Sequence, residues 1–325
     1  MSRLNELRMI ARVAQMYFVE GQRQRDIAER LQISQASISR MLKKAHEEGM
    51  IRTTVISPSG TYAELESALR SKFNLREAIV VECTEDREGA IMTRIGEAAA
   101  HFLEMTLQKG EIIGVSSWSE TILKMVDAIH PVKSGKVERV VQTLGGIGDP
   151  TVQIHANQLT TRLAKLTHSE AHLLNTPGVV QSHEAKLVLL NDNYVRETMD
   201  FFDKITLAIV GIGAIAPSNM LARSGNVFSS RELVEIKEAG GVGDISLRFF
   251  DAEGGLVKTP LNDRVIGMTL EELSRVDRVV ALAGGQFKTL AIQGALRTGI
   301  IDLLITDKFT AERLITSGAE QGSVN

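Results

Sequence analysis

The chain has a single cysteine, Cys83, among its 325 residues, and so cannot form an internal disulfide framework. No apolar run reaches the roughly 20 residues that a membrane-spanning helix needs. The amino-terminal segment mixes charge into an amphipathic pattern and lacks the apolar core of a secretory signal. These absences predict a cytoplasmic protein with no membrane partner, in a compartment where thiols stay reduced.

The chain also lacks the overall positive charge typical of nucleic-acid-binding proteins, because its net charge is −3. The distribution is uneven. Residues 1–58 hold ten Lys and Arg against six Asp and Glu, a net charge of +4, and the remainder holds 27 against 34, a net charge of −7. A basic segment before an acidic one indicates DNA contact at one end only.

Length and composition predict a globular protein with room for two domains, since 43% of the residues are hydrophobic and 24% are charged. Residues 57–60, Ser-Pro-Ser-Gly, form a turn cluster that marks the boundary. Residues 61–64 have capping-box spacing and open a helix that ends at Phe73. We therefore predict a DNA-binding domain over 1–57, a linker helix over 58–76 and a larger domain over 77–325.

Residues 22–49 are typical of a helix-turn-helix. Ser34 is a good N-cap for a second helix over 35–48, and Ile38, Leu42 and Ala45 recur on one face of it. The turn has Gln32 where glycine is usual, so we expect some backbone strain there. A first helix over 4–20 should support this pair through an apolar face, and a short strand is predicted over 50–56. The inward side chains expected on that first helix are Leu7, Ile10, Ala11, Ala14 and Phe18.

The opposite face of the second helix has small polar residues near its start and cations further along. That order suits a helix entering the major groove by its N-terminal end, with short side chains at the bases and cations at phosphates. The predicted DNA-binding residues are Arg25, Gln35, Ala36, Ser37, Ser39, Arg40, Lys43 and Lys44. The alternative is an ordinary helical hairpin with a solvated face.

From residue 78 onward, apolar strand-like runs alternate with helical stretches. The predicted strands are 78–82, 111–117, 137–146, 172–175, 205–213, 278–285 and 302–307. The predicted helices are 91–107, 121–129, 153–166, 231–239, 289–297 and 311–316. Continuous apolar strands alternating with helices predict a doubly wound, mostly parallel α/β domain with both faces of its sheet covered.

Four segments at predicted strand ends are rich in Gly, Ser and Asn: 114–121, 145–149, 211–219 and 284–288. Parallel sheets bind ligands at the carboxyl ends of their strands, so these segments predict a polar cleft for a small, oxygen-rich ligand. Among their residues are Trp118, Glu120, Gly145, Gly146, Gly211 and Gly213. Trp118 either stacks on a sugar face or belongs to the core. Asp244, Asp251 and Asp307 lie at element edges, where capping is the expected role.

The sequence resembles the SorC family of sugar-responsive transcriptional regulators, which are DeoR-like, over nearly its whole length. The blocks that carry the resemblance are the segment 24–51, GVSSWSET (114–121), LGG (144–146), TPG (176–178), VGIGA (210–214), GGVGDISLRFFD (240–251), AGGQFKTLAIQGAL (283–296) and LLITDKFTAERLI (303–315). It implies an effector domain similar to the NagB/RpiA/CoA-transferase-like fold, a sugar or sugar-phosphate effector, a homodimer or homotetramer, and a repressor.

By the same resemblance, Ser116, Ser117 and Thr121 belong to a loop that contacts the effector. Gly284, Gly285 and Lys288 match a glycine turn whose lysine faces the phosphate of the ligand, as a helix start with exposed N–H groups would allow. Many relatives have an arginine in the first loop, whereas this chain has Glu120. A carboxylate near an anion site repels phosphate, which favours a neutral polyol or sugar.

Together these features predict a transcriptional regulator of a carbohydrate or polyol operon, with no catalytic set, no metal site and no cofactor. The competing class is a sugar-phosphate isomerase-like enzyme with a DNA-binding segment attached. Against it, no carboxylate pair or carboxylate–histidine set has a spacing that assigns acid and base roles. A third alternative is a regulator that acts through protein partners.

Overall fold

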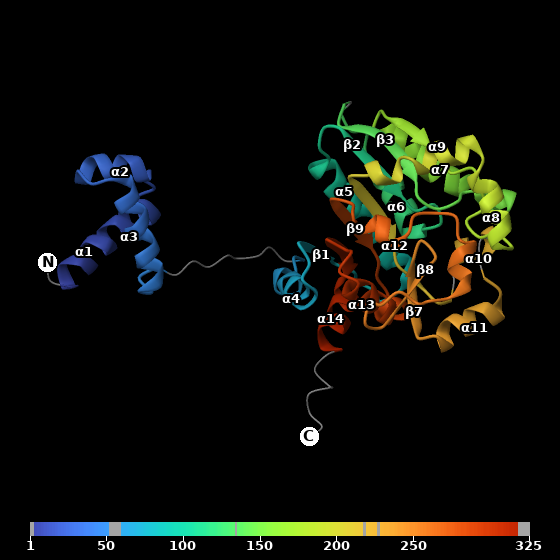
Figure 1. The fold of residues 1–325 in the computed structure, drawn as a ribbon. Helices are drawn as coiled ribbons and strands as arrows, with labels where there is room; N and C mark the ends of the chain where they lie inside the picture. The colour runs from blue at the N-terminus through green and yellow to red at the C-terminus, as the bar shows by residue number, and fades with distance from the viewer. Residues whose placement is uncertain (1–2, 52–59, 134, 217–218, 226–227, 318–325) are drawn as a thin grey trace, which may run out of the picture. The chain divides into compact units, whose positions relative to one another are not determined.

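The computed structural model describes residues 3–51, 60–133, 135–216, 219–225 and 228–317. The chain divides into two compact units, Met1–Pro58 and Ser59–Asn325, which are labelled by element in Figure 1. The strand predicted over 50–56 and most of the turn cluster at 57–60 lie outside the described residues. Across the ranges described, no helix is both long enough and apolar enough to cross a membrane.

The first unit is helical throughout its described part. Its elements are α1 (Arg3–Ala14), the π-helical turn η1 (Gln15–Val19), α2 (Gln24–Leu31) and α3 (Gln35–Glu47). Ile10, Val13, Ile27 and Ile38 are fully buried and hold the three helices together. The predicted all-α unit is thus confirmed.

The predicted inward face of the first helix is partly wrong. Ala11 and Phe18 are exposed, whereas Val13 is buried beside Ile10 and Ala14. Val13 lies about 60° around the helix from Ile10 on one side, and Ala11 lies about 100° away on the other, so a face that includes both Ile10 and Val13 excludes Ala11. Phe18 is 46% exposed, and its ring lies edge-on to His46 at the margin of the bundle.

The turn between α2 and α3 forms as predicted. Gln32 adopts the left-handed conformation with φ of 53°, and its N–H donates to the carbonyls of Ala28 and Glu29 at the end of α2. Ser34 caps α3, since its Oγ accepts from the Ser37 N–H at 3.2 Å. These two devices end one helix and begin the next within four residues, which fixes the helix-turn-helix.

The second unit is built on a seven-stranded sheet in which every neighbouring pair is parallel. In spatial order the strands are β1 (Glu77–Val81), β10 (Leu303–Asp307), β9 (Arg278–Leu282), β5 (Leu207–Gly211), β2 (Glu111–Val115), β3 (Val137–Gln142) and β4 (Glu170–His172). Six of the seven overlap the predicted strands closely. The edge strand β4 was predicted two residues too late, because it is polar and the apolar run follows it.

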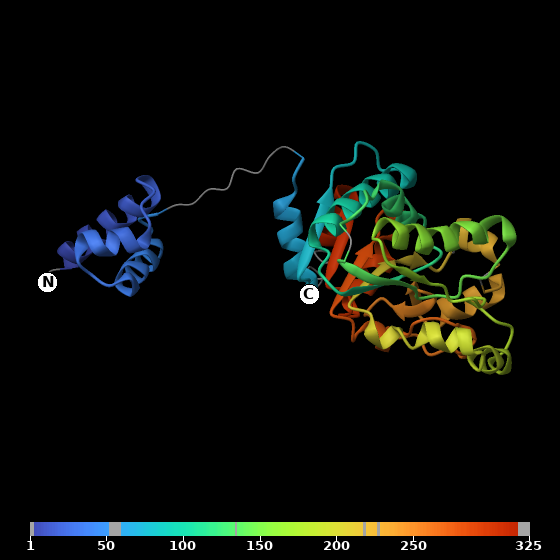
Figure 2. The same cartoon turned by 90° about the horizontal axis from the view of Figure 1, so that it is seen from above.

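Helices cover both faces of this sheet, as Figure 2 shows. The described helices of the unit are α4 (Ala63–Phe73), α5 (Glu88–Thr106), α6 (Glu120–Ala128), α7 (Pro150–Leu166), α8 (His183–Leu190), α9 (Asn193–Met199), α10 (Asn219–Ser224), α11 (Ser230–Glu238), α12 (Leu270–Leu273), α13 (Thr289–Arg297) and α14 (Lys308–Thr316), with 3₁₀ turns η2 (Phe202–Lys204), η3 (Pro260–Arg264) and η4 (Gln286–Lys288). Of these, α10 packs against α7 and α11 against β7 (Gly241–Ile245) of the smaller sheet described below.

The two faces bury separate cores, which explains the continuous apolar strands. Ile209 of β5 and Val280 of β9 pack under α5, α6 and α7, whereas Val210 and Ala281 pack with α4, α9, α13 and α14. Successive strand residues point to opposite faces, so nearly every residue of a strand covered on both sides is buried and apolar. The doubly wound, mostly parallel α/β fold is confirmed.

A second, antiparallel sheet was not predicted. It contains β6 (Gly213–Ala214), β7 (Gly241–Ile245) and β8 (Arg248–Asp251). The two-residue turn between β7 and β8 is Ser246-Leu247, and both residues have positive φ, 52° and 61°. Such turns usually contain glycine, so the sequence gives little sign of this hairpin.

The hairpin is anchored by Arg248, which is only 6% exposed. Its guanidinium donates to the carbonyls of Asn262 at 2.8 Å and Gly267 at 3.0 Å. These bonds compensate for burying a cation, and they tie β8 to the segment around η3. The strained turn is thus held from its base.

Helix α4, predicted as a linker, packs against β1 and α14 within the second unit, and its Leu69 is fully buried. The helix begins at Ala63 with Tyr62 as N-cap, one residue later than the predicted capping box requires, and the side chain of Tyr62 makes no cap bond. Tyr62 instead donates its phenol proton to Glu82, whose other carboxylate oxygen accepts from Lys308 at 2.6 Å. These contacts fasten the start of α4 to the strands beneath it.

Candidate functional site

Helix α3 exposes one polar face of the first unit. Gln35, Ala36, Ser39 and Arg40 are exposed, and the side chain of Lys43 is 80% exposed with Glu47 at 4.0 Å. Arg25 on α2 is also exposed and lies 3.8 Å from Asp26 and from Glu29. Loose contacts of this kind stabilise little and leave the cations available to another anion.

Three of the predicted DNA-binding residues, Ser37, Arg40 and Lys44, make contacts of 3.3 Å or less within the unit. Ser37 shares a hydrogen bond with Ser34 at 2.9 Å and accepts from Arg40 at 3.3 Å. Lys44 forms an ion pair with Glu6 of α1 at 2.6 Å, and the bond raises the pKa of Lys44 and lowers the pKa of Glu6. Lys44 therefore helps to hold α3 on α1, and Lys43 is the more available cation.

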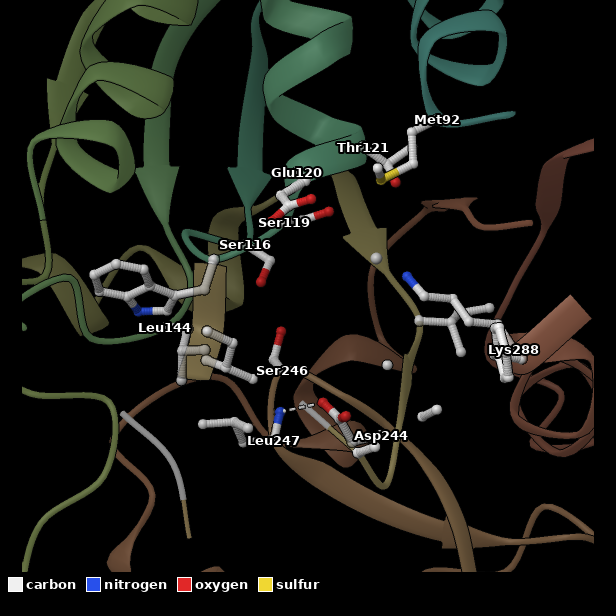
Figure 3. A pocket seen from close by; sticks show the side chains of 18 of the residues that line it. Met92, Ser116, Ser119, Glu120, Thr121, Leu144, Asp244, Ser246, Leu247 and Lys288 are labelled. Carbon is white, nitrogen blue, oxygen red and sulfur yellow. Dashed lines mark hydrogen bonds between the residues drawn. The ribbon is translucent and has the colours of Figure 1, made fainter. Parts of the chain in front are cut away.

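A cavity of about 290 Å³ lies at the carboxyl ends of β2, β5 and β9 in the second unit. Three of the four predicted strand-end segments contribute to it, together with the first turn of α5 and the tip of the β7–β8 hairpin. Figure 3 shows the side chains that point into it. The lining residues are Glu88, Met92, Ser116, Trp118, Ser119, Glu120, Thr121, Leu144, Gly211, Ile212, Gly213, Ala214, Ala216, Leu221, Asp244, Ser246, Leu247, Phe287 and Lys288.

Seven of the predicted effector-binding residues line this cavity: Ser116, Trp118, Glu120, Thr121, Gly211, Gly213 and Lys288. Trp118 is 5% exposed and donates from Nε1 to the carbonyl of Gly145 at 2.8 Å. It therefore belongs to the core and also lines the cavity. Lys288 is half-buried, and its ammonium has no ion-pair partner among the described residues.

The other five predicted residues do not line the cavity. Ser117 is fully buried and donates to the carbonyl of Leu144 at 2.7 Å, because adjacent residues point in opposite directions at a strand end. A Cβ at Gly145 would lie 2.5 Å from the backbone of Pro177, and one at Gly146 would lie 2.5 Å from Gln142. These two glycines permit close packing and do not contact a ligand space.

The glycine turn before Lys288 is also engaged internally. The N–H of Gly285 donates to Thr310 Oγ1 at 2.7 Å and to Asp307 Oδ2 at 3.2 Å. A Cβ at Gly284 would collide with the same carboxylate. The turn therefore positions Lys288, while its Gly285 amide is already satisfied by the chain.

Asp244 is the most informative lining residue that sequence reasoning missed. It was expected to act as a cap, as Asp307 does for α14 and Asp251 does for the turn at Gly255. Asp244 does cap the β7–β8 turn as expected, and it also faces the cavity from β7, where it is only 8% exposed. Its Oδ2 accepts from the Leu247 N–H at 2.8 Å, whereas its Oδ1 lies against Gly213 with no hydrogen-bond donor among the described residues.

The electrostatic setting of Asp244 is unusual. Burial raises the pKa of its carboxyl to about 6, against the opposing effects of the Leu247 N–H and the Lys288 ammonium. Perturbed carboxyls in a cavity mark candidate binding sites. Within the described residues, no group of three metal-ligating side chains is present.

Comparison with known proteins agrees with this geometry. A family model described as "Putative sugar-binding domain" matches residues 57–316. The deoxyribonucleoside regulator of Bacillus subtilis strain 168 is 30% identical over 93% of this chain and 95% of its own length. The crystal structure of the full-length sorbitol operon regulator SorC from Klebsiella pneumoniae matches with a TM-score of 0.71 at 28% identity, over 95% of this chain and 98% of that one.

A third match is the sugar-binding domain of the transcriptional regulator DeoR from Pseudomonas syringae pv. tomato, with a TM-score of 0.63 at 42% identity, over 79% of this chain and all of that one. Fold, cavity and relatives together define a transcriptional regulator with a sugar-binding domain. The chain belongs to the SorC family of such regulators, which confirms the resemblance seen in its sequence. The regulator interpretation is supported over the isomerase alternative.

Proposed function

We propose that the first unit binds an operator through α3 and that a sugar, polyol or sugar phosphate in the cavity of the second unit controls this binding. The exposed polar face of α3 supports the first part, and the cavity at the carboxyl ends of β2, β5 and β9, with its polar lining residues, supports the second. The genes controlled would belong to a carbohydrate or polyol catabolic operon. In this proposal the protein acts as a repressor and is not an enzyme.

The proposed DNA contacts divide by side chain. Short polar groups near the start of α3 reach base edges or flank them, and cations further along neutralise phosphates. The residues proposed are Arg25, Gln35, Ala36, Ser37, Ser39, Arg40, Lys43 and Lys44. Lys44 would have to leave Glu6 to reach a phosphate, so Lys43 is the stronger candidate.

A homodimer or homotetramer is part of the proposal, because a helix-turn-helix reads one half-site and pairs of half-sites lie about 34 Å apart or at multiples of that distance. Control by ligand requires two arrangements of the oligomer that bind the ligand with different affinity. Sedimentation with and without operator DNA would measure the oligomeric state.

The proposal is tested by titrating the protein against its own upstream DNA in the presence of sugars, polyols and their phosphates. One compound should change the operator affinity at a fixed salt concentration. Turnover of the same compounds is measured in parallel. If the protein ignores DNA and converts a sugar phosphate, the proposal is wrong and the enzyme alternative holds.

Replacing Lys43 by alanine should weaken binding to specific and unrelated DNA alike. Loss of one phosphate contact lowers the slope of log affinity against log salt by about 0.9 and the affinity by roughly threefold to tenfold. Fluorescence anisotropy at several salt concentrations measures both quantities. Lys109→Ala is the matched control, since Lys109 is an exposed lysine of the second unit. An unchanged slope in Lys43→Ala would remove Lys43 from the interface.

A further inference from the structure

The cavity carries more negative than positive side chains. Glu88, Glu120 and Asp244 line it, against Lys288 as the one lining cation among the described residues. Figure 3 shows Glu120 and Ser119 projecting from one side, with Lys288 and Asp244 on the other. A phosphate ester entering this space would bring further negative charge to a site that already has an excess of it. Asp244 is buried and Glu120 is half-buried, so solvent screens these two charges incompletely, whereas Glu88 is exposed.

The helix starts that face the cavity have their own carboxylates. Helix α6 begins at Glu120, with Ser119 accepting from the Ile122 N–H at 3.3 Å, and α5 begins at Glu88. A helix start attracts anions through its free N–H groups and its dipole. An acidic residue in the first turn supplies a negative charge that interacts favourably with both. The Gly285 N–H is likewise taken by Thr310 and Asp307. A phosphate would therefore meet a carboxylate at the first residue of each helix and, at Gly285, an amide that already has acceptors in the chain.

The remaining polar groups suit hydroxyls. Asp244 Oδ1 has no donor among the described residues, and the Lys288 ammonium has no ion-pair partner among them. A carboxylate accepts O–H groups and an ammonium donates to oxygen, so a polyol can satisfy both at once. Ser116 and Ser246 add hydroxyls that either donate or accept.

The hairpin tip that holds this arrangement is strained. Ser246 and Leu247 both have positive φ without being glycine, and both line the cavity. Non-glycine residues in this conformation are uncommon and gather at ligand-binding elements. The Asp244–Leu247 hydrogen bond and the buried Arg248 keep the tip in place. The tip therefore presents Asp244 and Ser246 in a fixed position before any ligand binds.

We propose that the cavity binds an uncharged polyol or free sugar and discriminates against the phosphate ester of the same compound. Asp244 and Glu120 accept hydroxyl protons of the ligand, and Lys288 donates to a ligand oxygen. The inference rests on the proposed function for the identity of the cavity as the effector site, and it adds the charge of the effector.

The test measures direct binding to the full chain by calorimetry, with each uncharged compound paired with its ester. The probes are a panel of such pairs that includes D-glucitol with D-glucitol 6-phosphate and 2-deoxy-D-ribose with its 5-phosphate. An uncharged member is expected to bind about tenfold or more tightly than its ester, as one unfavourable charge contact in a partly buried site predicts. Tighter binding of the ester overturns the inference, and so does a panel in which no uncharged compound binds.

Two variants assign the effect to residues. Glu120→Gln should reduce the discrimination against the ester by about tenfold, because it removes a negative charge and keeps the shape. Asp244→Asn should lower the affinity for the uncharged ligand by about tenfold, since the amide nitrogen donates a hydrogen bond where the carboxylate oxygen accepts one. Glu64→Gln is the control, because Glu64 is an exposed carboxylate on α4 outside the cavity. Discrimination unchanged in both cavity variants would overturn the roles given to these carboxylates.

The pH dependence supplies a separate readout. Asp244 must be ionised to accept a hydroxyl proton, and its pKa is raised to about 6 by burial, with Lys288 facing it and Glu120 and Glu88 also lining the cavity. Ligand affinity should therefore rise about tenfold from pH 5 to pH 7 in the wild type and stay level in Asp244→Asn. A flat profile in the wild type would contradict the acceptor role.

The binding assay contains no DNA, which separates the two proposals. If an ester binds best and changes operator affinity, the proposed function stands and the inference on charge fails. If a polyol binds best but leaves operator affinity unchanged, the inference on charge stands and the proposed control of DNA binding fails.

Discussion

Ile38→Ala should abolish DNA binding while the second unit keeps its ligand affinity. Ile38 is fully buried on α3 among Ile10, Ile27 and Leu42. Removing a buried isoleucine to alanine costs about 2–5 kcal/mol. A unit of this size is stabilised by only about 5 kcal/mol, so much of its folded population would be lost. We expect operator affinity to fall by about 100-fold or more.

The measurement combines DNA binding with amide hydrogen exchange on the full chain. Protection should disappear from α2 and α3 and remain in the strands of the second unit, because the units are separate compact bodies. Ile38→Val is the matched control, since it removes one methylene at a cost of about 1 kcal/mol and should keep the fold. Wild-type operator affinity in Ile38→Ala would mean that α3 does not carry the interface.

Gly213→Ala should weaken ligand binding by about 100-fold, as displacement of a buried polar contact predicts. A Cβ at Gly213 would lie 2.2 Å from Asp244 Oδ1, so the carboxylate must move. That carboxylate also holds the Leu247 N–H, and its displacement shifts the hairpin tip. The second unit should lose about 1–3 kcal/mol of stability from overpacking.

Calorimetry and thermal unfolding of the full chain measure the two effects of this substitution. Gly89→Ala is the matched control, since its Cβ would meet only the end of the Arg87 side chain at 3.9 Å. Adding Asp244→Gly to Gly213→Ala removes the clash but also removes the hydrogen bond to the Leu247 N–H, so ligand affinity should not recover. Recovery of ligand affinity in the double variant would show that Asp244 fills space and does not contact the ligand.

Ionisation of Asp244 also sets a pH dependence of stability. A raised carboxyl pKa means that the folded state binds more protons than the unfolded state between about pH 4 and pH 6. The stabilisation from this group is therefore fully present below about pH 4 and lost as the pH rises through 6. The proposed ligand needs the ionised form of Asp244. The contribution of Asp244 to the stability of the second unit is therefore smallest above pH 6, where ligand affinity is expected to be highest.

The fold was predictable where the signals are local. Ser34 caps α3 through a hydrogen bond three residues away, and Gln32 closes α2 within its own turn, so both features lie in a short stretch of sequence. The strands of the main sheet were found because burial on both faces makes them continuously apolar. β4 was misplaced because it is a polar edge strand.

The cavity was less predictable, because its walls depend on contacts between distant segments. Asp244 faces it only because β7 pairs with β6, and nothing near Asp244 in the sequence marks that pairing. Ser116 and Ser117 are chemically alike, yet one lines the cavity and the other bonds to Leu144. Likewise, a Cβ at any of Gly145, Gly146, Gly211 and Gly213 would collide with a neighbour, yet only Gly211 and Gly213 line the cavity. Glycine and serine residues at strand ends therefore indicate where the cavity lies, but they do not show which of these residues line it.

The contact between Gly284 and Asp307 also limits how this sequence can diverge. A side chain at 284 would displace the carboxylate that caps α14 and accepts from the Gly285 N–H. Neither residue can change alone without loss, so a relative with alanine at 284 should also have a smaller or shifted residue at 307. These two positions lie 23 residues apart, one just after β9 and the other at the end of β10, and they should change together in evolution.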